Sequence, residues 1–221
     1  MPGLLQGIRY QLMLRILLIS IICVVVAGCA SAPPERSTTA TASAEARAHQ
    51  AQLANLKAWQ LDGQIAVFER MIDERHAVYL RWQHQPSATQ LRFSHPLKGT
   101  LATLTADASG AVLQRDGEAP LWASDITTLL EQRLNLPLPV KLLQQTVIGA
   151  LPVSSQQIRY LADGTVADFM VTADQQQWQV KFLAYQAVQL NEQNLVLPHQ
   201  VELISDQYLV RLRISTWTPL N

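Results

Sequence analysis

The chain has 221 residues, of which 48% are hydrophobic and 15% are charged. This composition excludes an intrinsically disordered protein, because disorder requires low hydrophobicity and a high net charge. Seventeen Lys and Arg residues balance 17 Asp and Glu residues, so we expect no nucleic-acid binding, which depends on clustered basic side chains. Both cysteines, Cys23 and Cys29, lie near the N-terminus. The body of the protein therefore has neither a disulfide framework nor a cysteine-based zinc site.

The first residues have the pattern of a bacterial export signal. Two basic residues, Arg9 and Arg15, precede the uncharged apolar segment 16–27, which is too short for a comfortable membrane span. Small residues then lead to Cys29, as in the lipobox of bacterial lipoproteins. Residues 1–28 are therefore predicted to be a lipoprotein signal peptide, with Cys29 as the lipidation site. The alternatives are an ordinary cleaved signal and a short N-terminal anchor.

Residues 29–43 are predicted to comprise the lipidated cysteine and a flexible tether, because the segment 31–42 is rich in Ser, Thr, Ala and Pro. Lipidation would anchor the chain to a membrane without making it span one. No Asp follows the cysteine, which favours the outer membrane under the sorting rule known for enterobacterial lipoproteins. Residues 44–221 are predicted to form a single domain. It begins with a helix from 44 to about 58, which Ser43 would cap and which should pack on the domain.

From Trp59 onward, apolar and polar residues alternate with a period of two. The clearest cases are the segments 76–83, 89–95, 178–182 and 208–215. Such alternation predicts antiparallel strands with one buried and one solvated face. Turn signals separate these strands at Ser109-Gly110, Asp116-Gly117 and Asp163-Gly164. The pattern predicts about ten or eleven strands, with boundaries uncertain by a few residues.

Two short helices are predicted to interrupt the strands in mid-chain. Ser124 can cap the first, which carries Leu130 on its apolar stripe. The second begins near Pro139, carries Leu143 on its apolar stripe and stops at Gly149. A long sheet with one apolar face must curl to hide that face. The predicted fold is mainly β with helices: a single antiparallel sheet curled into an open half-barrel, lidded by short helices that enclose an apolar cavity.

Eight apolar side chains are candidates for lining this cavity. They are Val78, Leu80, Trp82, Leu91, Phe93 and Trp178 from the strands, with Leu130 and Leu143 from the helices. An apolar pocket within β-structure is the usual place for a hydrophobic ligand. Trp82 and Trp178 fit ordinary core packing equally well, and the sequence leaves both roles open.

No residue pattern supports catalysis or a bound metal. The chain has no Gly-x-Ser-x-Gly elbow, no phosphate-binding glycine loop and no dinucleotide fingerprint. The histidines His76, His84 and His95 fit no zinc spacing and are expected to be solvated. Asp73-Glu74 is expected to lie in a solvated turn. We therefore expect no catalytic residue, no metal and no cofactor.

The segment 94–100 is predicted to form a tight loop between two strands. Pro96 stops a strand and Gly99 permits a sharp return. Leu97 is the only sizeable aliphatic residue between them. If it is exposed, it is available to contact a bilayer or a partner. The alternative is that Leu97 folds back and plugs the end of the barrel.

The chain resembles a known family, the outer-membrane lipoprotein receptor LolB. The residues that carry the resemblance run in order from about Leu53 to Trp217. They are 59–67 (WQLDGQIAV), 81–85 (RWQHQ), Pro96-Leu97, 136–139 (LPLP), 148–152 (IGALP), Trp178 and Trp217. The chain departs from the family pattern at Gln64, where a basic residue is usual, at Thr146, where Trp is frequent, and at Lys98, where Gly is frequent.

The resemblance implies a lidded half-barrel that accepts acylated lipoproteins from the soluble periplasmic carrier LolA and inserts them into the outer membrane. It also implies that Leu97, next to Pro96, is the exposed leucine that aids insertion. The expected protein is a monomer, lipid-anchored in the outer membrane and facing the periplasm, with lipoprotein cargo and outer-membrane lipids as partners. Two other hypotheses remain: a lipid-binding or structural envelope lipoprotein without transfer activity, and a periplasmic hydrolase of envelope lipid or glycan.

Overall fold

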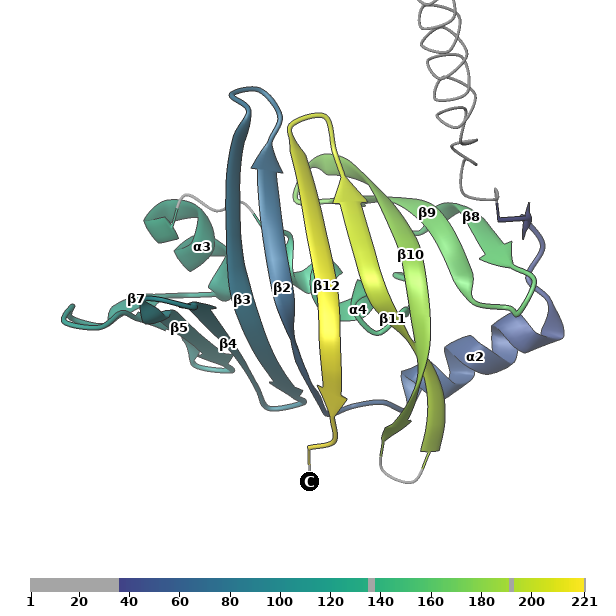
Figure 1. Ribbon diagram of the computed structural model, residues 1–221, viewed down its shortest axis with the longest axis horizontal. Coiled ribbons are helices and arrows are strands. Elements are labelled where there is room, and N and C mark those ends of the chain that lie inside the picture. The colour runs from purple at the N-terminus through teal and green to yellow at the C-terminus, as the bar shows by residue number, and fades with distance from the viewer. Residues whose placement is uncertain (1–35, 135–137, 191–192, 221) are drawn as a thin grey trace, which may run out of the picture. The chain divides into compact units, whose positions relative to one another are not determined.

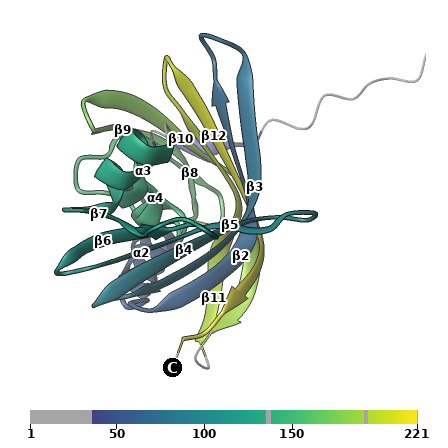
Figure 2. The same cartoon turned by 90° about the vertical axis from the view of Figure 1, so that its left-hand side faces the viewer.

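The computed structural model describes residues 36–134, 138–190 and 193–220, so the predicted signal peptide and Cys29 lie outside the described residues. The described residues from Ser37 onward belong to one compact unit. In this unit twelve strands form one antiparallel sheet that is open at both edges, and the sheet curves around an interior that holds two of three short helices (Figures 1 and 2). The predicted fold class is confirmed.

The strands follow the alternation in the sequence. Their bounds are β1 Thr38–Thr39, β2 Trp59–Glu69, β3 Glu74–Gln85, β4 Ala88–His95, β5 Gly99–Asp107, β6 Gly110–Gln114, β7 Leu121–Ala123, β8 Gln156–Leu161, β9 Val166–Ala173, β10 Gln176–Leu190, β11 Gln193–Ile204 and β12 Tyr208–Thr218. The sheet has the order β1-β8-β9-β10-β11-β12-β2-β3-β4-β5-β6-β7. The described strands exceed the predicted number because β1 and β7 are too short to show alternation.

One residue in two along the strands faces the core. In β2, Trp59, Leu61, Ile65 and Val67 are all buried, and the residues between them are more exposed. The predicted hairpin at Asp163-Gly164 is confirmed, since β8 and β9 pair on either side of it. The order of the sheet makes the last strand, β12, the neighbour of β2. This pairing joins two groups of strands that are far apart in the sequence.

The N-terminal helix α2 (Ala44–Ala54) is shorter than predicted. Ser43 caps it as expected, because its Oγ accepts a hydrogen bond from the Ala46 amide at 3.2 Å. The predicted end near residue 58 is wrong, since the Asn55 amide already donates to the Gln52 carbonyl and closes the last turn. Ala46, His49 and Leu53 are buried, which confirms that α2 packs on the domain.

The segment predicted to be a flexible tether is partly ordered. Thr38 and Thr39, which form β1, pair with Tyr160 and Leu161 at the edge of the sheet. Backbone hydrogen bonding to an exposed sheet edge requires no apolar side chain. The composition of the segment therefore gave no sign of this pairing.

The helix α3 (Ile126–Leu134) begins one residue later than its predicted cap implies. Asp125, not Ser124, caps it: the Asp125 carboxylate accepts hydrogen bonds from the amide and the hydroxyl of Thr128, both at 3.0 Å. Ser124 instead donates its hydroxyl to Asp125. A charged acceptor suits the positive end of the helix dipole, which explains the exchange of roles. The helix α4 (Val140–Thr146) starts after Pro139, as predicted.

Candidate functional site

The structure brings the eight candidate pocket residues together on the inner side of the sheet. They lie on β3 (Val78, Leu80 and Trp82), β4 (Leu91 and Phe93), β10 (Trp178), α3 (Leu130) and α4 (Leu143). Seven of them belong to one apolar core cluster, and the half-buried Val78 packs against it. The helices lie within the curve of the sheet (Figure 2). The eight residues therefore face inward as the sequence pattern predicted, and their contact with an acyl chain stays a prediction.

The side chains of the apolar interior are almost completely buried. The seven buried residues are each no more than 3% exposed, and Leu130 on α3 and Leu143 on α4 are 0% and 1% exposed. Side chains this buried pack against one another as a core.

The two tryptophans differ in their polar contacts. Trp82 donates its indole N–H to the Thr89 hydroxyl at 2.8 Å, so it is tied to the neighbouring strand. The indole N–H of Trp178 is buried and has no hydrogen-bond partner among the described residues. Both rings pack in the apolar core.

A polar contact links the helix α4 to the sheet. The side-chain amide of Gln144 lies 3.0 Å from Nε2 and 3.2 Å from Nδ1 of His84, at the end of β3. The imidazole also lies against Trp59, with 5.2 Å between ring centroids. Burial lowers the pKa of His84, because it penalises the charged form. This histidine, which the sequence suggested was solvated, is therefore part of the contact between helix and sheet.

Leu97 lies at the tip of the turn between β4 and β5. Its side chain is 91% exposed, and Pro96 beside it is exposed too. The turn holds itself together: the Lys98 amide donates to the His95 carbonyl at 3.2 Å, and the Leu97 amide lies 3.2 Å from His95 Nδ1. Gly99 has a φ of +72°, which its lack of a side chain permits. The alternative that Leu97 plugs the barrel is therefore wrong for this structure.

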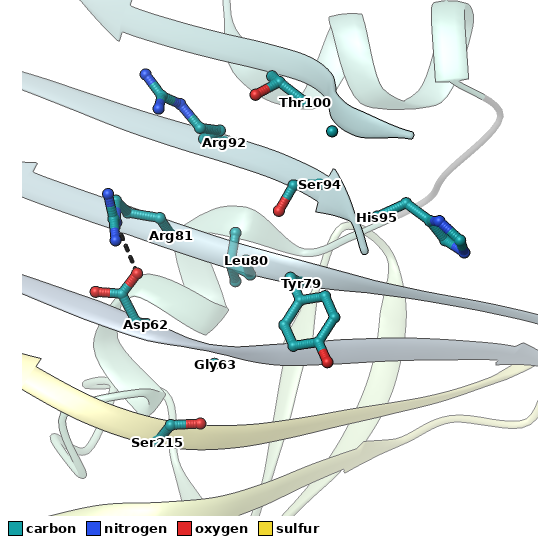
Figure 3. Close-up of a pocket in the computed structure, with 11 residues that line it drawn as sticks. Asp62, Gly63, Tyr79, Leu80, Arg81, Arg92, Ser94, His95, Thr100 and Ser215 are labelled. Carbon is teal, nitrogen blue, oxygen red and sulfur yellow. Dashed lines mark hydrogen bonds and ion pairs between the residues drawn. The ribbon is translucent and has the colours of Figure 1, made fainter. Parts of the chain in front are cut away.

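A polar hollow of about 460 Å³ lies on the outer face of the sheet beside this turn (Figure 3). Its lining includes Arg81, Arg92, Ser94 and Thr100. From the sequence, Arg81 and Arg92 were expected on the solvated face of strands and Ser94 and Thr100 at the ends of the predicted loop 94–100, and none of the four was assigned a function. The available signal was their alternation with buried residues, which placed them on one face but could not show that they lie together.

Two kinds of site are absent from the described part of the chain. No helix there is both long and apolar enough to cross a membrane. Within the same residues, no group of three or more His, Cys, Asp or Glu side chains is arranged to hold a metal ion. The apolar interior, the Leu97 turn and the polar hollow are the features that we consider further as functional candidates.

The chain is similar to known proteins along most of its length. A family model described as outer membrane lipoprotein LolB matches residues 57–217. The outer-membrane lipoprotein LolB of Vibrio cholerae serotype O1 is 27% identical over 194 residues, which cover 88% of this chain and 91% of that protein. The outer-membrane lipoprotein LolB of Pseudomonas putida is 31% identical over 174 residues, which cover 78% of this chain and 80% of that protein.

One solved structure has a similar fold without similar sequence. A DUF1329 family protein from Desulfovibrio piger superposes with a TM-score of 0.50 at 6% identity, over 79% of this chain and 90% of that chain. At this identity the likeness concerns the fold alone.

Proposed function

The chain belongs to the LolB family of outer-membrane lipoproteins, and from this premise we propose that it accepts acylated lipoproteins from the periplasmic carrier LolA and inserts them into the outer membrane. The protein is an outer-membrane lipoprotein with a receptor role in lipoprotein localisation. We propose that its acyl anchor is attached at Cys29, at the start of the predicted tether 29–43. No catalytic step is part of this function.

The energetics of acyl chains explain why a protein is needed for the transfer. Each methylene of an acyl chain that leaves water is stabilised by about 0.8 kcal/mol, so moving a chain of roughly 14 methylenes from an apolar environment into water would cost about 11 kcal/mol of free energy. A lipoprotein therefore cannot diffuse freely between carrier and membrane. An apolar protein interior and an apolar bilayer differ little as environments for the chain. The hand-over can thus proceed without a nucleotide.

The apolar interior supports the accepting step. Its side chains, from Leu80 and Trp82 on the sheet to Leu130 and Leu143 on the helices, would surround acyl chains with hydrocarbon. Because these residues pack against each other, acyl chains would enter by separating α3 and α4 from the sheet. The contact between Gln144 and His84 holds α4 in the closed position until then.

The exposed Leu97 is the observation that carries the insertion step. A large apolar side chain that is 91% exposed contributes almost nothing to folding. Transfer of the same side chain from water into the acyl region of a bilayer would be favourable by about 1.5–3 kcal/mol of free energy. Leu97 therefore engages the outer membrane and brings the mouth of the half-barrel to its surface, after which the acyl chains move into the bilayer.

A reconstituted transfer assay tests this function. LolA loaded with a lipoprotein is mixed with the mature chain carrying Cys29→Ala, and then with liposomes, and the location of the cargo is followed. We expect the cargo to move to this chain and on to the liposomes. In the additional variant Leu97→Glu, cargo should reach the protein, but delivery should fall by about tenfold or more because the apolar contact is replaced by a charge.

The matched control is Val153→Glu, which removes another fully exposed aliphatic side chain in a different loop. It should deliver cargo at the rate of the unaltered sequence. If Leu97→Glu delivers equally well, the role of Leu97 in insertion is wrong. If no cargo moves to any form, the protein is an envelope lipoprotein without transfer activity.

A further inference from the structure

The polar hollow beside the Leu97 turn has the chemistry of an anion site. It is built from outward-facing residues of β3, β4 and β5, with Asp62 on β2 and Ser215 on β12 at its far side (Figure 3). Of the described residues that line it, Leu80 alone also belongs to the apolar core, and the polar side chains of the lining lie outside that core. The hollow is therefore distinct from the interior proposed to hold acyl chains.

Two arginines face each other across neighbouring strands in this hollow. The register pairs Arg81 on β3 directly with Arg92 on β4, and like charges in such positions destabilise a sheet. Arg81 is compensated, since its Nε donates to Asp62 Oδ1 at 2.6 Å. Arg92 is exposed and has no ion-pair or hydrogen-bond partner among the described residues. An anion bound at Arg92 would remove the remaining repulsion.

Hydroxyl groups complete the lining. Tyr79, Ser94, Thr100 and Ser215 all line the hollow, and within the described chain their hydroxyls make no hydrogen bond to other protein groups. Two irregularities of the sheet adjoin it: a register shift in β12 next to Ser215, and one in the β4–β5 pair next to Ser94. Such bulges redirect side chains and are frequent beside functional sites. Unpaired hydroxyl donors around a guanidinium are typical partners of phosphate oxygens.

The position of the hollow identifies the source of the phosphate. Ser94 and Thr100 are each three residues from Leu97, which places them roughly 10 Å behind the tip of the turn. The headgroup layer of a bilayer is roughly 5–8 Å thick on each side of the acyl core. When Leu97 reaches the acyl region, these hydroxyls come to the level of the lipid phosphates. The Arg92 guanidinium points away from the turn in this structure (Figure 3), so the exposed side chain has to swing toward the turn to reach the same phosphate.

We propose that this hollow binds the phosphate group of a membrane lipid, with Arg92 as its main charge partner, while Leu97 enters the acyl region. The proposal rests on the membrane role of Leu97 in the proposed function. The apolar side chain supplies attraction to any bilayer, and the hollow supplies a polar contact that fixes the depth and orientation of the turn. Lipids with an uncompensated phosphate, such as phosphatidylglycerol, are the strongest ligands.

The test measures how often the turn enters a bilayer. The full lipidated chain is placed in phosphatidylcholine vesicles with or without phosphatidylglycerol, and an environment-sensitive dye is attached at Lys98→Cys. Labelling is specific, since the only natural cysteines are Cys23 and Cys29, within and just after the predicted signal peptide. The lipid anchor keeps every variant at the membrane. The dye then reports only the ratio of immersed to free turns.

We expect phosphatidylglycerol to raise this ratio and Arg92→Gln to lower it about tenfold on these vesicles, the effect of losing one charge-assisted hydrogen bond. The matched control is Arg213→Gln, which removes the same charge from an exposed position of the outer face outside the hollow. It should leave the ratio unchanged. Oleate at the same mole fraction should replace phosphatidylglycerol less well, because a carboxylate offers fewer acceptor oxygens to the surrounding hydroxyl groups than a phosphate does.

Three results would contradict the lipid-phosphate site. The immersed fraction could fall equally in Arg92→Gln and Arg213→Gln, which would indicate general charge attraction. Oleate could raise the immersed fraction as much as phosphatidylglycerol does. Millimolar inorganic phosphate could lower the immersed fraction to the level of Arg92→Gln, which would make free phosphate the ligand.

The variant Leu97→Glu separates this site from the proposed membrane role of Leu97. If it leaves immersion unchanged, the membrane role of Leu97 fails; if immersion depends on Leu97 but not on Arg92, only the lipid-phosphate site fails.

Discussion

Three leucines on the hairpin of β4 and β5 have opposite environments. Leu91 and Leu104 pair across the two strands and are 2% and 0% exposed, whereas Leu97 at the connecting turn is 91% exposed. The first two stabilise the fold by leaving water, and the third does not. A residue that contributes so little to folding is free to serve a contact outside the protein. Burial thus separates the structural leucines of this hairpin from its functional candidate.

The largest expected effect is the difference in stability between truncating a buried leucine and truncating the exposed one. Leu104→Ala should lower the free energy of unfolding by about 2–5 kcal/mol, because it leaves a cavity in the core. Leu97→Ala should change it by less than about 0.5 kcal/mol, as is usual for exposed positions. Urea denaturation of the two variants measures both values. Equal losses would show that Leu97 packs against the domain in solution and would break the comparison.

A smaller effect is expected at the start of α3, the helix that covers the interior. Asp125→Ala should cost about 1 kcal/mol of stability, because the amide of Thr128 loses its capping acceptor. Ser124→Ala should cost much less, since Ser124 only donates to Asp125. Thermal denaturation of both variants distinguishes the two candidate caps. A larger loss in Ser124→Ala would restore the capping role that the sequence first indicated.

The smallest expected effect is a pH dependence at the contact between α4 and β3. Burial lowers the pKa of His84 in the folded protein below its unfolded value of about 6.5. Between these two pKa values the unfolded chain binds more protons, so stability is complete above the unfolded pKa and falls as the pH drops through this window. His84→Gln should remove part of this dependence. Its melting temperature should therefore fall less than that of the unaltered protein between about pH 7.5 and about pH 5.5. Equal falls would contradict the assignment.

Much of the fold could be predicted because its rules are local. Alternation along β3 and β4 identified Leu80, Trp82 and Phe93 as inward-facing residues, and all three are buried. Pro139 correctly marked the start of α4. Local patterns failed where two adjacent residues had similar chemistry, as at Ser124 and Asp125. They also failed where a segment without an apolar pattern joined the sheet through its backbone alone, as β1 does.

The candidate site also has features that the sequence predicts and features that it does not. Leu97 could be selected from the sequence as an aliphatic residue in a tight turn, but its exposure could not, because a turn can project or fold back with the same sequence. The sequence also could not show that Arg92 and Ser215 line the same hollow from opposite sides, since 123 positions separate them and only the strand order brings β4 and β12 into one region of the sheet. The contact between His84 and Gln144 depends on the docking of α4.

The sequence by itself determined the fold class, the inward-facing residues and the family, because side-chain alternation and motif order are properties of the chain. Only the tertiary structure decided that β12 lies beside β2, that the interior is closed by Leu130 and Leu143, and that Leu97 projects into solvent beside a polar hollow. The physical reason is that the pleat of a strand assigns each side chain to a face locally. Which strands and loops then become neighbours depends on the packing of the whole sheet.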